Sequence, residues 1–322
     1  MRVGIDVSPL VQTGAGTARH VRGLLAGLEG RPGLELRRLT FGASGRAATI
    51  ARDVAWYPVG IARAARPVDV LHCTTMRGPV RARPPVVVTV HDLALLRHPE
   101  AFPAWHRHTG RQVLRHGVPR ADAVVAVSEF TRSELVELLR IPEERIRVVR
   151  NGVEPVFTPA GAAASGDYVL AVGTLEPRKN LARTVEAAQL AGVALRVVGA
   201  RGWGGIEVPG WTGRVGDEEL AALYRGARCL VFPSLYEGFG IPVLEAMACG
   251  TPVVTTRGGA TEEVAGAAAV LVDALDVAAI AGGIAEAETR RDELRRLGLE
   301  RAREFTWAQA ADAVEALWRE LA

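Results

Sequence analysis

Cysteine is scarce in this chain of 322 residues, which contains only Cys73, Cys229 and Cys249. These three form no C-x-x-C pair and no pattern interleaved with histidine, so the sequence offers no ligand set typical of a structural zinc site. An odd number of cysteines also gives no complete disulfide framework. We therefore expect a reducing, cytoplasmic setting and no bound metal.

Long uninterrupted hydrophobic runs are also missing. The most apolar stretch, residues 264–285, is interrupted by Asp273 and Asp276, which argues against a membrane span and for a buried strand followed by a helix. The N-terminal MRVGIDVSPL places Asp6 inside its first apolar run and has no small-residue cleavage site. It is therefore expected to form a strand rather than a signal peptide.

The net charge of +3 hides an asymmetry between the two halves of the chain. Residues 1–150 hold 23 arginines and 13 acidic residues, a net charge of +10, whereas residues 151–322 hold 16 basic and 23 acidic residues, a net charge of −7. The basic half could attract anionic lipid head groups, nucleic acid or a phosphorylated acceptor, because the summed surface charge steers polyanions. A solvated arginine-rich surface is the alternative.

Short runs rich in valine and isoleucine alternate with segments of helical length, which is typical of an α/β fold with parallel sheets covered by helices on both faces. At 322 residues and 48% hydrophobic composition, the chain can form two domains with separate cores. Strands are expected at residues 3–7, 86–90, 123–127, 168–172, 195–198, 229–232, 252–255 and 269–272.

A linker is expected between the halves, where residues 150–167 combine an Asn-Gly pair, two prolines and several small residues. The first domain is therefore expected over residues 1–152 and the second over residues 153–305. The last segment, residues 306–322, has apolar residues at helical spacing and predicts a helix with one apolar face.

Two loops of the first half follow expected strands. Gly14 and Gly16 precede a helical segment, where glycines let a ligand approach the backbone and the helix N-terminus favours an anion. Arg19 stands where the fingerprint G-x-G-x-x-G needs its third glycine, so an NAD site is not expected and a simple turn is the alternative. His91 follows the run VVVTV, at a strand end where ligands bind in open α/β sheets. It could instead cap a helix or bond to neighbouring backbone.

The loop GTLEPRKN begins at Gly173 after another expected strand and carries Arg178 and Lys179. Two adjacent cations at this place suit a diphosphate. Lys179 is the only lysine among 39 basic residues, so a background that otherwise supplies arginine has kept a compact ammonium here. A surface charge pair is the alternative.

The segment LYEGFGIPVLEAMACGTPVV contains Glu237 and Glu245 separated by seven residues, with Gly238 and Gly240 between them. The glycines permit a tight strand-to-helix turn whose backbone amides can bind phosphate, and the carboxylates can accept hydrogen bonds from hydroxyls. A sugar nucleotide presents hexose and ribose hydroxyls on either side of a diphosphate. A solvated pair of glutamates is the alternative.

These motifs, together with VHDL, AVSEFT and VVRNGV, make the sequence similar to the retaining glycosyltransferases of family four along nearly its whole length. The resemblance implies the GT-B architecture, in which two Rossmann-like domains with parallel sheets face a central cleft. It implies that the N-terminal domain binds the acceptor and the C-terminal domain the nucleotide sugar. It also implies that the helix over residues 306–322 packs back on the N-terminal domain.

The resemblance implies roles for individual residues. Glu237 contacts the donor sugar hydroxyls, Glu245 contacts the ribose, and Arg178 and Lys179 clamp the diphosphate. Residues that support the sugar and phosphates through the backbone are Gly238, Phe239, Gly240 and Ile241.

The segment GRVGDEEL resembles the family's loop beside the nucleobase. This implies that Val215 lies next to the base and that a helix follows, for which Asp217 is expected to be the N-cap. Many family members carry Gly-Arg where this chain has Gly173-Thr174, which puts more weight on Arg178 and Lys179 as phosphate ligands.

The family mechanism implies that cations and helix N-termini, rather than a metal, stabilise the leaving nucleoside diphosphate. The chain has no D-x-D sequence, and no cofactor is expected besides the donor substrate. His91 is expected beside the donor hexose but not as a general base.

IDVSPL and GTLEPRKN resemble bacterial mannosyl- and rhamnosyltransferases of polysaccharide assembly, which favours GDP-mannose as donor and a glycan or lipid-linked acceptor. The enzyme is expected in the cytoplasm, in peripheral contact with the anionic inner face of the membrane, with no nucleic acid partner.

Three other functions remain to be weighed. An NAD-dependent nucleotide-sugar epimerase or dehydrogenase would need an intact dinucleotide loop and usually a Tyr-x-x-x-Lys pair, and Lys179 stands four residues after Leu175 instead of a tyrosine. A pyridoxal-dependent phosphorylase would have to use Lys179 as its Schiff-base lysine. A non-catalytic sugar-nucleotide or nucleic-acid binding protein would retain its ligand without turnover.

Overall fold

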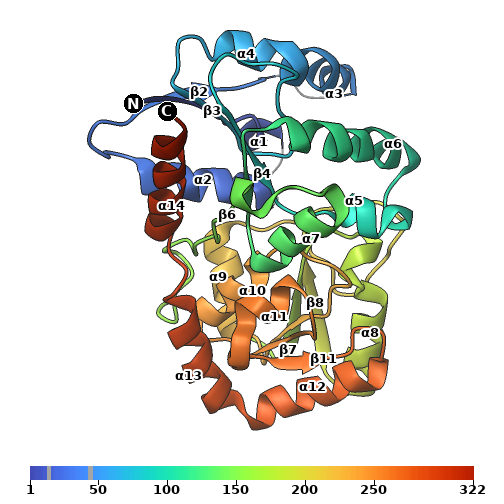
Figure 1. The fold of residues 1–322 in the computed structure, drawn as a ribbon. Coiled ribbons are helices and arrows are strands. Elements are labelled where there is room, and N and C mark those ends of the chain that lie inside the picture. The colour runs from blue at the N-terminus through green and yellow to red at the C-terminus, as the bar shows by residue number, and fades with distance from the viewer. Residues whose placement is uncertain (13–15, 43–45) are drawn as a thin grey trace. The chain divides into compact units, whose positions relative to one another are not determined.

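The computed structural model describes residues 1–12, 16–42 and 46–322, which divide into two compact units (Figure 1). Unit 1 comprises residues 1–97, 104–152 and 306–322, and unit 2 comprises residues 98–103 and 153–305. Residues 98–103 thus pack with the second unit, although they precede the linker by some fifty residues of sequence.

Unit 1 is built on a parallel sheet of six strands in the order β2-β1-β3-β4-β5-β6. The strands are β1 (Arg2–Asp6), β2 (Glu35–Leu39), β3 (Val70–Cys73), β4 (Val86–Val90), β5 (Ala123–Ala126) and β6 (Ile146–Val148). The α-helices are α1 (Pro9–Gln12), α2 (Gly16–Leu28), α3 (Arg46–Ala51), α4 (Ile61–Ala64), α5 (Ala94–Arg97), α6 (Ala104–Gln112), α7 (Glu129–Leu139) and α14 (Trp307–Leu321). The described residues of unit 1 also form the π-helical segments η1 (Arg52–Gly60) and η3 (Val113–Gly117) and the 3-10 turns η4 (Val118–Arg120) and η5 (Glu143–Arg145).

Unit 2 is built on a parallel sheet of five strands in the order β11-β10-β9-β7-β8. The strands are β7 (Tyr168–Val172), β8 (Ala194–Val198), β9 (Leu230–Phe232), β10 (Val253–Thr256) and β11 (Val270–Val272). The α-helices are α8 (Leu181–Leu190), α9 (Asp217–Gly226), α10 (Ile241–Ala248), α11 (Ala260–Ala265), α12 (Val277–Thr289) and α13 (Arg291–Ala302). The 3-10 turns are η2 (Pro99–Ala101), η6 (Pro177–Lys179) and η7 (Gly266–Ala268).

Valine-rich strands form because both faces of each sheet are buried, so every position along a strand favours an apolar side chain. In β4, Val87 packs in the cluster that contains α2 and α14, whereas Val86 and Val88 pack on the opposite face of the sheet. The α/β class and the parallel sheets expected from the sequence are confirmed, and each expected strand occurs with its ends within one residue.

Three strands and one helix cap differ from the expectation. Strands β2, β3 and β6 were not expected, because β2 (ELRRL) is a largely exposed edge strand, and β3 (VLHC) and β6 (IRV) are short runs that each include a polar residue. Asp217 is not an N-cap: α9 begins at Asp217 itself and Gly216 is the capping residue. The carboxylate instead lies in the first helical turn, where the helix dipole favours it.

The C-terminal helix α14 packs in unit 1 through a surface of glycines. A Cβ atom on Gly23 would lie 1.9 Å from Cε2 of Trp307, and one on Gly27 would lie 2.4 Å from the Trp307 carbonyl oxygen. A Cβ on Gly152 would lie 2.3 Å from the Trp307 amide nitrogen. Because only glycine leaves this space, the indole ring and backbone of Trp307 can lie directly against α2 and the end of the 150–152 loop.

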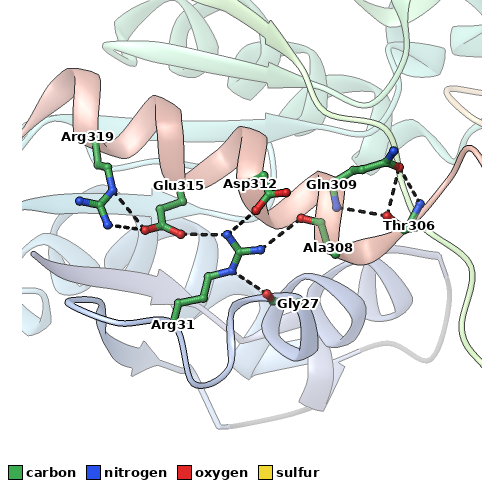
Figure 2. Close-up of polar contacts among 8 residues, drawn as sticks. All are labelled: Gly27, Arg31, Thr306, Ala308, Gln309, Asp312, Glu315 and Arg319. Atoms are coloured by element: carbon green, nitrogen blue, oxygen red, sulfur yellow. Dashed lines mark hydrogen bonds and ion pairs between the residues drawn. The ribbon is translucent and has the colours of Figure 1, made fainter.

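Polar contacts fix the same helix at its start and along its side (Figure 2). Thr306 and Gln309 form a reciprocal capping box at its N-terminus. Arg31, at the end of the turn after α2, donates to the carbonyl oxygen of Gly27 at 2.8 Å and pairs with Glu315 at 2.9 Å. The guanidinium groups of Arg319 and Arg31 lower the pKa of Glu315.

None of the helices in the described part of the chain combines the length and hydrophobicity needed to cross a bilayer.

Replacing Gly23 by alanine tests the fit of α14. We expect Gly23→Ala to lower the free energy of unfolding by about 1–3 kcal/mol, because the added methyl group meets a rigid indole ring. Gly282→Ala is the matched control: it also lies inside a helix, but its Cβ would meet nothing within 4 Å, so helix propensity alone should make it neutral or stabilising by up to about 1 kcal/mol. Equal denaturation midpoints for the two variants would contradict the fit.

Candidate functional site

A cluster of polar side chains lies at the carboxyl edge of the unit 2 sheet. Gly173 follows β7, and the turn η6 that comes next carries Arg178 and Lys179. Glu237 belongs to the connection between β9 and α10. Because β7 and β9 are parallel neighbours, their carboxyl ends meet at one edge, and this brings the two motifs together.

Asn180 holds the cationic turn in place. Its backbone has a φ of 57°, in the left-handed region, where asparagine is tolerated better than most residues. Its buried Nδ2 donates to the carbonyl oxygens of Pro233 at 3.0 Å and Ala274 at 2.6 Å, which lie in the connections after β9 and β11. One amide group thus ties η6 to two further strand ends.

Glu237 forms ion pairs with both cations of the turn. Its Oε1 lies 2.6 Å from Nζ of Lys179 and its Oε2 lies 3.1 Å from Nη1 of Arg178. Arg178 also pairs with Glu176 at 2.6 Å and donates to the carbonyl oxygen of Tyr236 at 2.9 Å. The side chains of Lys179, Arg178 and Glu237 are only 11–13% exposed, so the cluster consists of largely desolvated charges.

The charge state of Glu237 follows from two opposing effects. Burial raises the pKa of its carboxyl group, but the ammonium of Lys179 and the guanidinium of Arg178 outweigh burial and lower the pKa below its usual value. The Lys179 ammonium also lies 4.9 Å from the centre of the Phe232 ring, within range of a cation–π interaction. The carboxylate therefore stays ionised at neutral pH and keeps both cations oriented toward one point.

The turn before α10 requires glycine at Gly240. This residue has a φ of 102°, and a Cβ there would lie 3.0 Å from Cγ2 of Thr261. Gly240 is the N-cap residue of α10, which begins with Ile241 and Pro242. The N-terminus of α10 therefore follows Glu237 closely in the chain and adds the positive end of a helix dipole to this edge of the sheet.

Glu245 lies within α10 and is 2% exposed, much more enclosed than a surface glutamate. Its Oε2 accepts a hydrogen bond of 2.9 Å from the hydroxyl of Tyr224 on α9. The two glutamates of the motif thus differ in partner: Glu237 pairs with cations, and Glu245 with a phenol. Glu245 is joined to the site through the helix that starts there.

The other expected residues of unit 2 lie near the same edge of the sheet or within the same turn. Val215 is half-buried in the connection from β8 to α9, and this connection is tied to the end of β8 by the hydrogen bond from the Gly199 amide to the Gly213 carbonyl, 2.9 Å long. Phe239 is buried, and its ring meets that of Phe305 edge to face at 5.9 Å.

The remaining expected residues belong to unit 1. Gly14 lies outside the described residues, and Gly16 is the exposed first residue of α2. His91 lies at the carboxyl end of β4, half-buried, with its Nε2 2.9 Å from the carbonyl oxygen of Thr74. Burial lowers the pKa of His91. This contact with a neighbouring backbone is the alternative that the sequence analysis gave for His91. It uses Nε2, so Nδ1 of the ring can act as an acceptor.

Sequence reasoning assigned no role to Glu176, Asn180 or Tyr224, although the first two belong to GTLEPRKN. It also missed the segment 98–103, whose carbonyl oxygen at Ala101 accepts a hydrogen bond of 2.6 Å from Nε1 of Trp203. No periodicity marks these residues in the sequence. The partners of Asn180, Tyr224 and the segment 98–103 lie tens of residues away, whereas Glu176 pairs with Arg178 two residues later.

Comparisons with known proteins agree on one family. Residues 159–305 match the family described as Glycosyl transferases group 1, and residues 14–157 match Glycosyltransferase Family 4. The chain is 33% identical over 253 residues to O-antigen chain mannosyltransferase B of Escherichia coli, covering 69% of this chain and 66% of that protein. It is 32% identical over 267 residues to the D-inositol 3-phosphate glycosyltransferase of Mycolicibacterium smegmatis, covering 71% and 60%. The matches thus span about two thirds or less of these relatives' lengths.

Solved structures show the same architecture. Sucrose-phosphate synthase from Thermosynechococcus elongatus superposes with a TM-score of 0.76 at 18% identity, over 100% of this chain and 99% of that one. Anabaena HepE, solved in complex with UDP and glucose, superposes with a TM-score of 0.73 at 17% identity, over 99% of each chain. At these identities the likeness shows the fold, which is the GT-B fold expected from the sequence.

Removing Lys179 tests the electrostatics of the cluster. In Lys179→Met, Glu237 loses one counter-charge while it remains largely buried, so the free energy of unfolding at pH 7 should fall by about 1.5–3 kcal/mol. A carboxylate whose pKa is lowered in the folded state stabilises it above its unfolded pKa and loses that contribution as pH falls. The difference between the native protein and the variant should therefore shrink below about pH 4.5.

The matched control is Lys179→Met combined with Glu237→Gln, which removes the carboxylate that has lost one of its two counter-charges. Urea denaturation at pH 7 and pH 4 should show that the double variant is more stable than Lys179→Met at pH 7. A pH-independent loss in Lys179→Met would mean that Glu237 is not held ionised by this ammonium.

Proposed function

Because this chain belongs to glycosyltransferase family 4, with a C-terminal part of the group 1 type, we propose that it transfers a hexose from a nucleoside-diphosphate sugar to an acceptor hydroxyl. The observation that carries this proposal is the cluster in which Arg178, Lys179 and Glu237 converge beside the N-terminus of α10. Cations suit a diphosphate, and a carboxylate between them suits sugar hydroxyls.

The ion pairs suggest how the donor would be taken up. A diphosphate carries more charge than one carboxylate, so it would replace Glu237 as the partner of Lys179 and Arg178. Glu237 would then be free to accept hydrogen bonds from the hexose hydroxyls. The N-terminus of α10 would add partial positive charge to the phosphates. In this proposal Glu237 keeps the cations oriented before the donor arrives.

We further propose that the transfer is independent of metal and retains the anomeric configuration. Arg178, Lys179 and the α10 N-terminus would stabilise the charge that develops on the leaving nucleoside diphosphate. The acceptor hydroxyl would attack on the face from which the diphosphate leaves, and a leaving phosphate oxygen would take the acceptor proton. His91 would lie beside the hexose as a neutral group, in keeping with its lowered pKa.

The relatives suggest which donor and which acceptor the enzyme would use. O-antigen chain mannosyltransferase B is among them, which favours GDP-mannose as donor and a glycan or lipid-linked acceptor. The net charge of +10 over residues 1–150 favours an anionic acceptor or an anionic membrane surface at the cytoplasmic face, because such surfaces attract basic proteins.

Product analysis tests the reaction. With GDP-mannose and a mannosyl acceptor, we expect transfer to continue in excess EDTA and the product to keep the α configuration of the donor, as read from the anomeric signals in NMR. A β-linked product would refute retention, and loss of turnover that Mg²⁺ restores would refute metal independence. Absence of transfer from every GDP, UDP, dTDP and ADP sugar would argue for a binding protein instead.

A separate prediction concerns the different roles of the two glutamates, Glu237 toward the hexose and Glu245 toward the ribose. Glu237→Ala releases both cations, so the affinity for free GDP should stay the same or rise, while the rate of sugar transfer falls. Glu245→Ala should weaken GDP at least about tenfold, because a hydrogen bond to a charged partner contributes about 1.5–3 kcal/mol. Isothermal titration with GDP and with the intact donor measures both effects.

Tyr224→Phe is the control for Glu245. It removes the hydroxyl that bonds to Glu245 but leaves the carboxylate, so its GDP affinity should stay close to that of the native protein. If Glu237→Ala weakens GDP as much as Glu245→Ala does, the assignment of hexose to one glutamate and ribose to the other is wrong.

A further inference from the structure

A buried histidine on α2 has no place in the function described so far. His20 is 1% exposed, and its Nδ1 lies 2.7 Å from Oδ1 of Asn151. Because an amide oxygen only accepts hydrogen bonds, Nδ1 of His20 carries the hydrogen. The neutral ring is therefore fixed in one tautomer and in one orientation by its bond to Asn151.

Packing alone does not explain a histidine at this position. Among the described residues, Nε2 of His20 is buried and has no hydrogen-bond partner. A buried nitrogen without a partner costs stability, so phenylalanine or leucine would fill the same space at lower cost. The packing of the core therefore gives no reason for a polar ring here.

The neighbour that this orientation affects is His91. The two rings meet edge to face, with centroids 4.8 Å apart and planes at 82°. The His20 ring also meets the indole of Trp307 edge to face, with centroids 6.0 Å apart. Asn151 and Trp307 therefore hold the His20 ring in place, and the His91 ring packs against it.

Among the residues that the structure describes, one hydrogen bond holds the His91 ring, so a second contact is needed to fix its plane. Its Nε2 lies 2.9 Å from the carbonyl oxygen of Thr74, which places the hydrogen on Nε2 and leaves the Nδ1 lone pair as an acceptor. One hydrogen bond does not fix the plane of an imidazole ring, since the ring can rotate about that bond. A second contact from another direction removes this freedom.

Both rings are uncharged near neutral pH. Burial and the nearby His91 lower the pKa of His20 to about 3. Burial also lowers the pKa of His91, although Asp92 and the bond to Thr74 oppose it. The contact between the two neutral rings is therefore steric and dipolar, and neither ring needs to be protonated to the imidazolium form.

We propose that His20 is a positioning residue for His91: anchored to Asn151 and packed against Trp307, it fixes the plane in which the His91 ring presents its Nδ1. Asn151 belongs to the motif VVRNGV and His20 to helix α2, so both segments help to orient His91 of the motif VHDL. The effect on turnover rests on the proposed function, whereas the effect on the ring of His91 does not.

His20→Phe tests this, because it keeps an aromatic ring and loses the bond to Asn151. His72→Phe is the matched control: His72 is also fully buried in unit 1, its Nε2 lies 2.9 Å from the Thr89 hydroxyl, and its pKa is also lowered to about 3. Its ring meets Trp318 at 5.5 Å. Both variants lose one buried histidine bond, so a loss of stability is common to both.

The first readout is long-range ¹H–¹⁵N NMR of protein labelled at histidine, without any substrate. The native His91 should show hydrogen on Nε2 alone, and His72→Phe should keep that pattern. In His20→Phe, we expect the two nitrogen signals of His91 to move toward each other as the ring loses its fixed orientation. An unchanged His91 pattern in His20→Phe would overturn the proposal, as would the same change in His72→Phe.

The second readout is steady-state transfer. His20→Phe should lower kcat about tenfold or more with little change in the KM for donor, because small displacements of a positioned group cost large factors in rate. His72→Phe should stay near the native kcat. If the His91 signals change but kcat does not, the orientation of His91 has no role in transfer and that part of the proposal fails. If the native protein transfers no sugar at all, the proposed function fails while the NMR result still decides the positioning.

Discussion

The carboxylate of Glu237 is held between the ammonium of Lys179 and the guanidinium of Arg178, and the site of unit 2 is organised around this interaction. Two cations on adjacent residues repel each other, and each loses hydration when its side chain is largely buried. The carboxylate offsets both costs, and it comes from the connection after β9, the strand that lies next to β7 in the sheet. The same arrangement leaves two oriented cations available to any ligand with more negative charge than one carboxylate.

The backbone of the sheet makes this interaction possible. Parallel strands end at one edge, so the turn after β7 and the turn after β9 meet although Lys179 and Glu237 are 58 residues apart in the chain. Asn180 adds a rigid tie from the cationic turn to the connections after β9 and β11. The cations are thus fixed by backbone geometry and by one buried amide, and the charges only complete the arrangement.

In unit 1 the corresponding constraint is the close packing of α14. Glycines at Gly23, Gly27 and Gly152 leave room for Trp307, and Trp307 in turn packs against His20. The C-terminal helix therefore contributes to the environment of His91 as well as to the core. A residue of the C-terminal helix thus packs against His20, and His20 in turn packs against His91.

Much of the fold follows from the sequence alone. Runs such as VVVTV predict strands buried on both faces because they are almost entirely apolar and β-branched. GTLEPRKN and EGFGIPVLE are recognisable because glycine and charge stand where strands end. Local pattern fails where a strand has little to bury, as in β2, and where a cap can be supplied by either of two adjacent residues, as at Gly216 and Asp217.

The pairing of side chains was decided only by the tertiary structure. The residues around Glu237 do not indicate that its partners are Lys179 and Arg178. The segment TARHV does not indicate that His20 meets Asn151 and His91. The glycines likewise give no sign in the sequence that Trp307 packs on them. The physical reason is that periodicity and propensity act over a few residues, whereas these contacts join segments that only the closed sheet and the returning helix bring together.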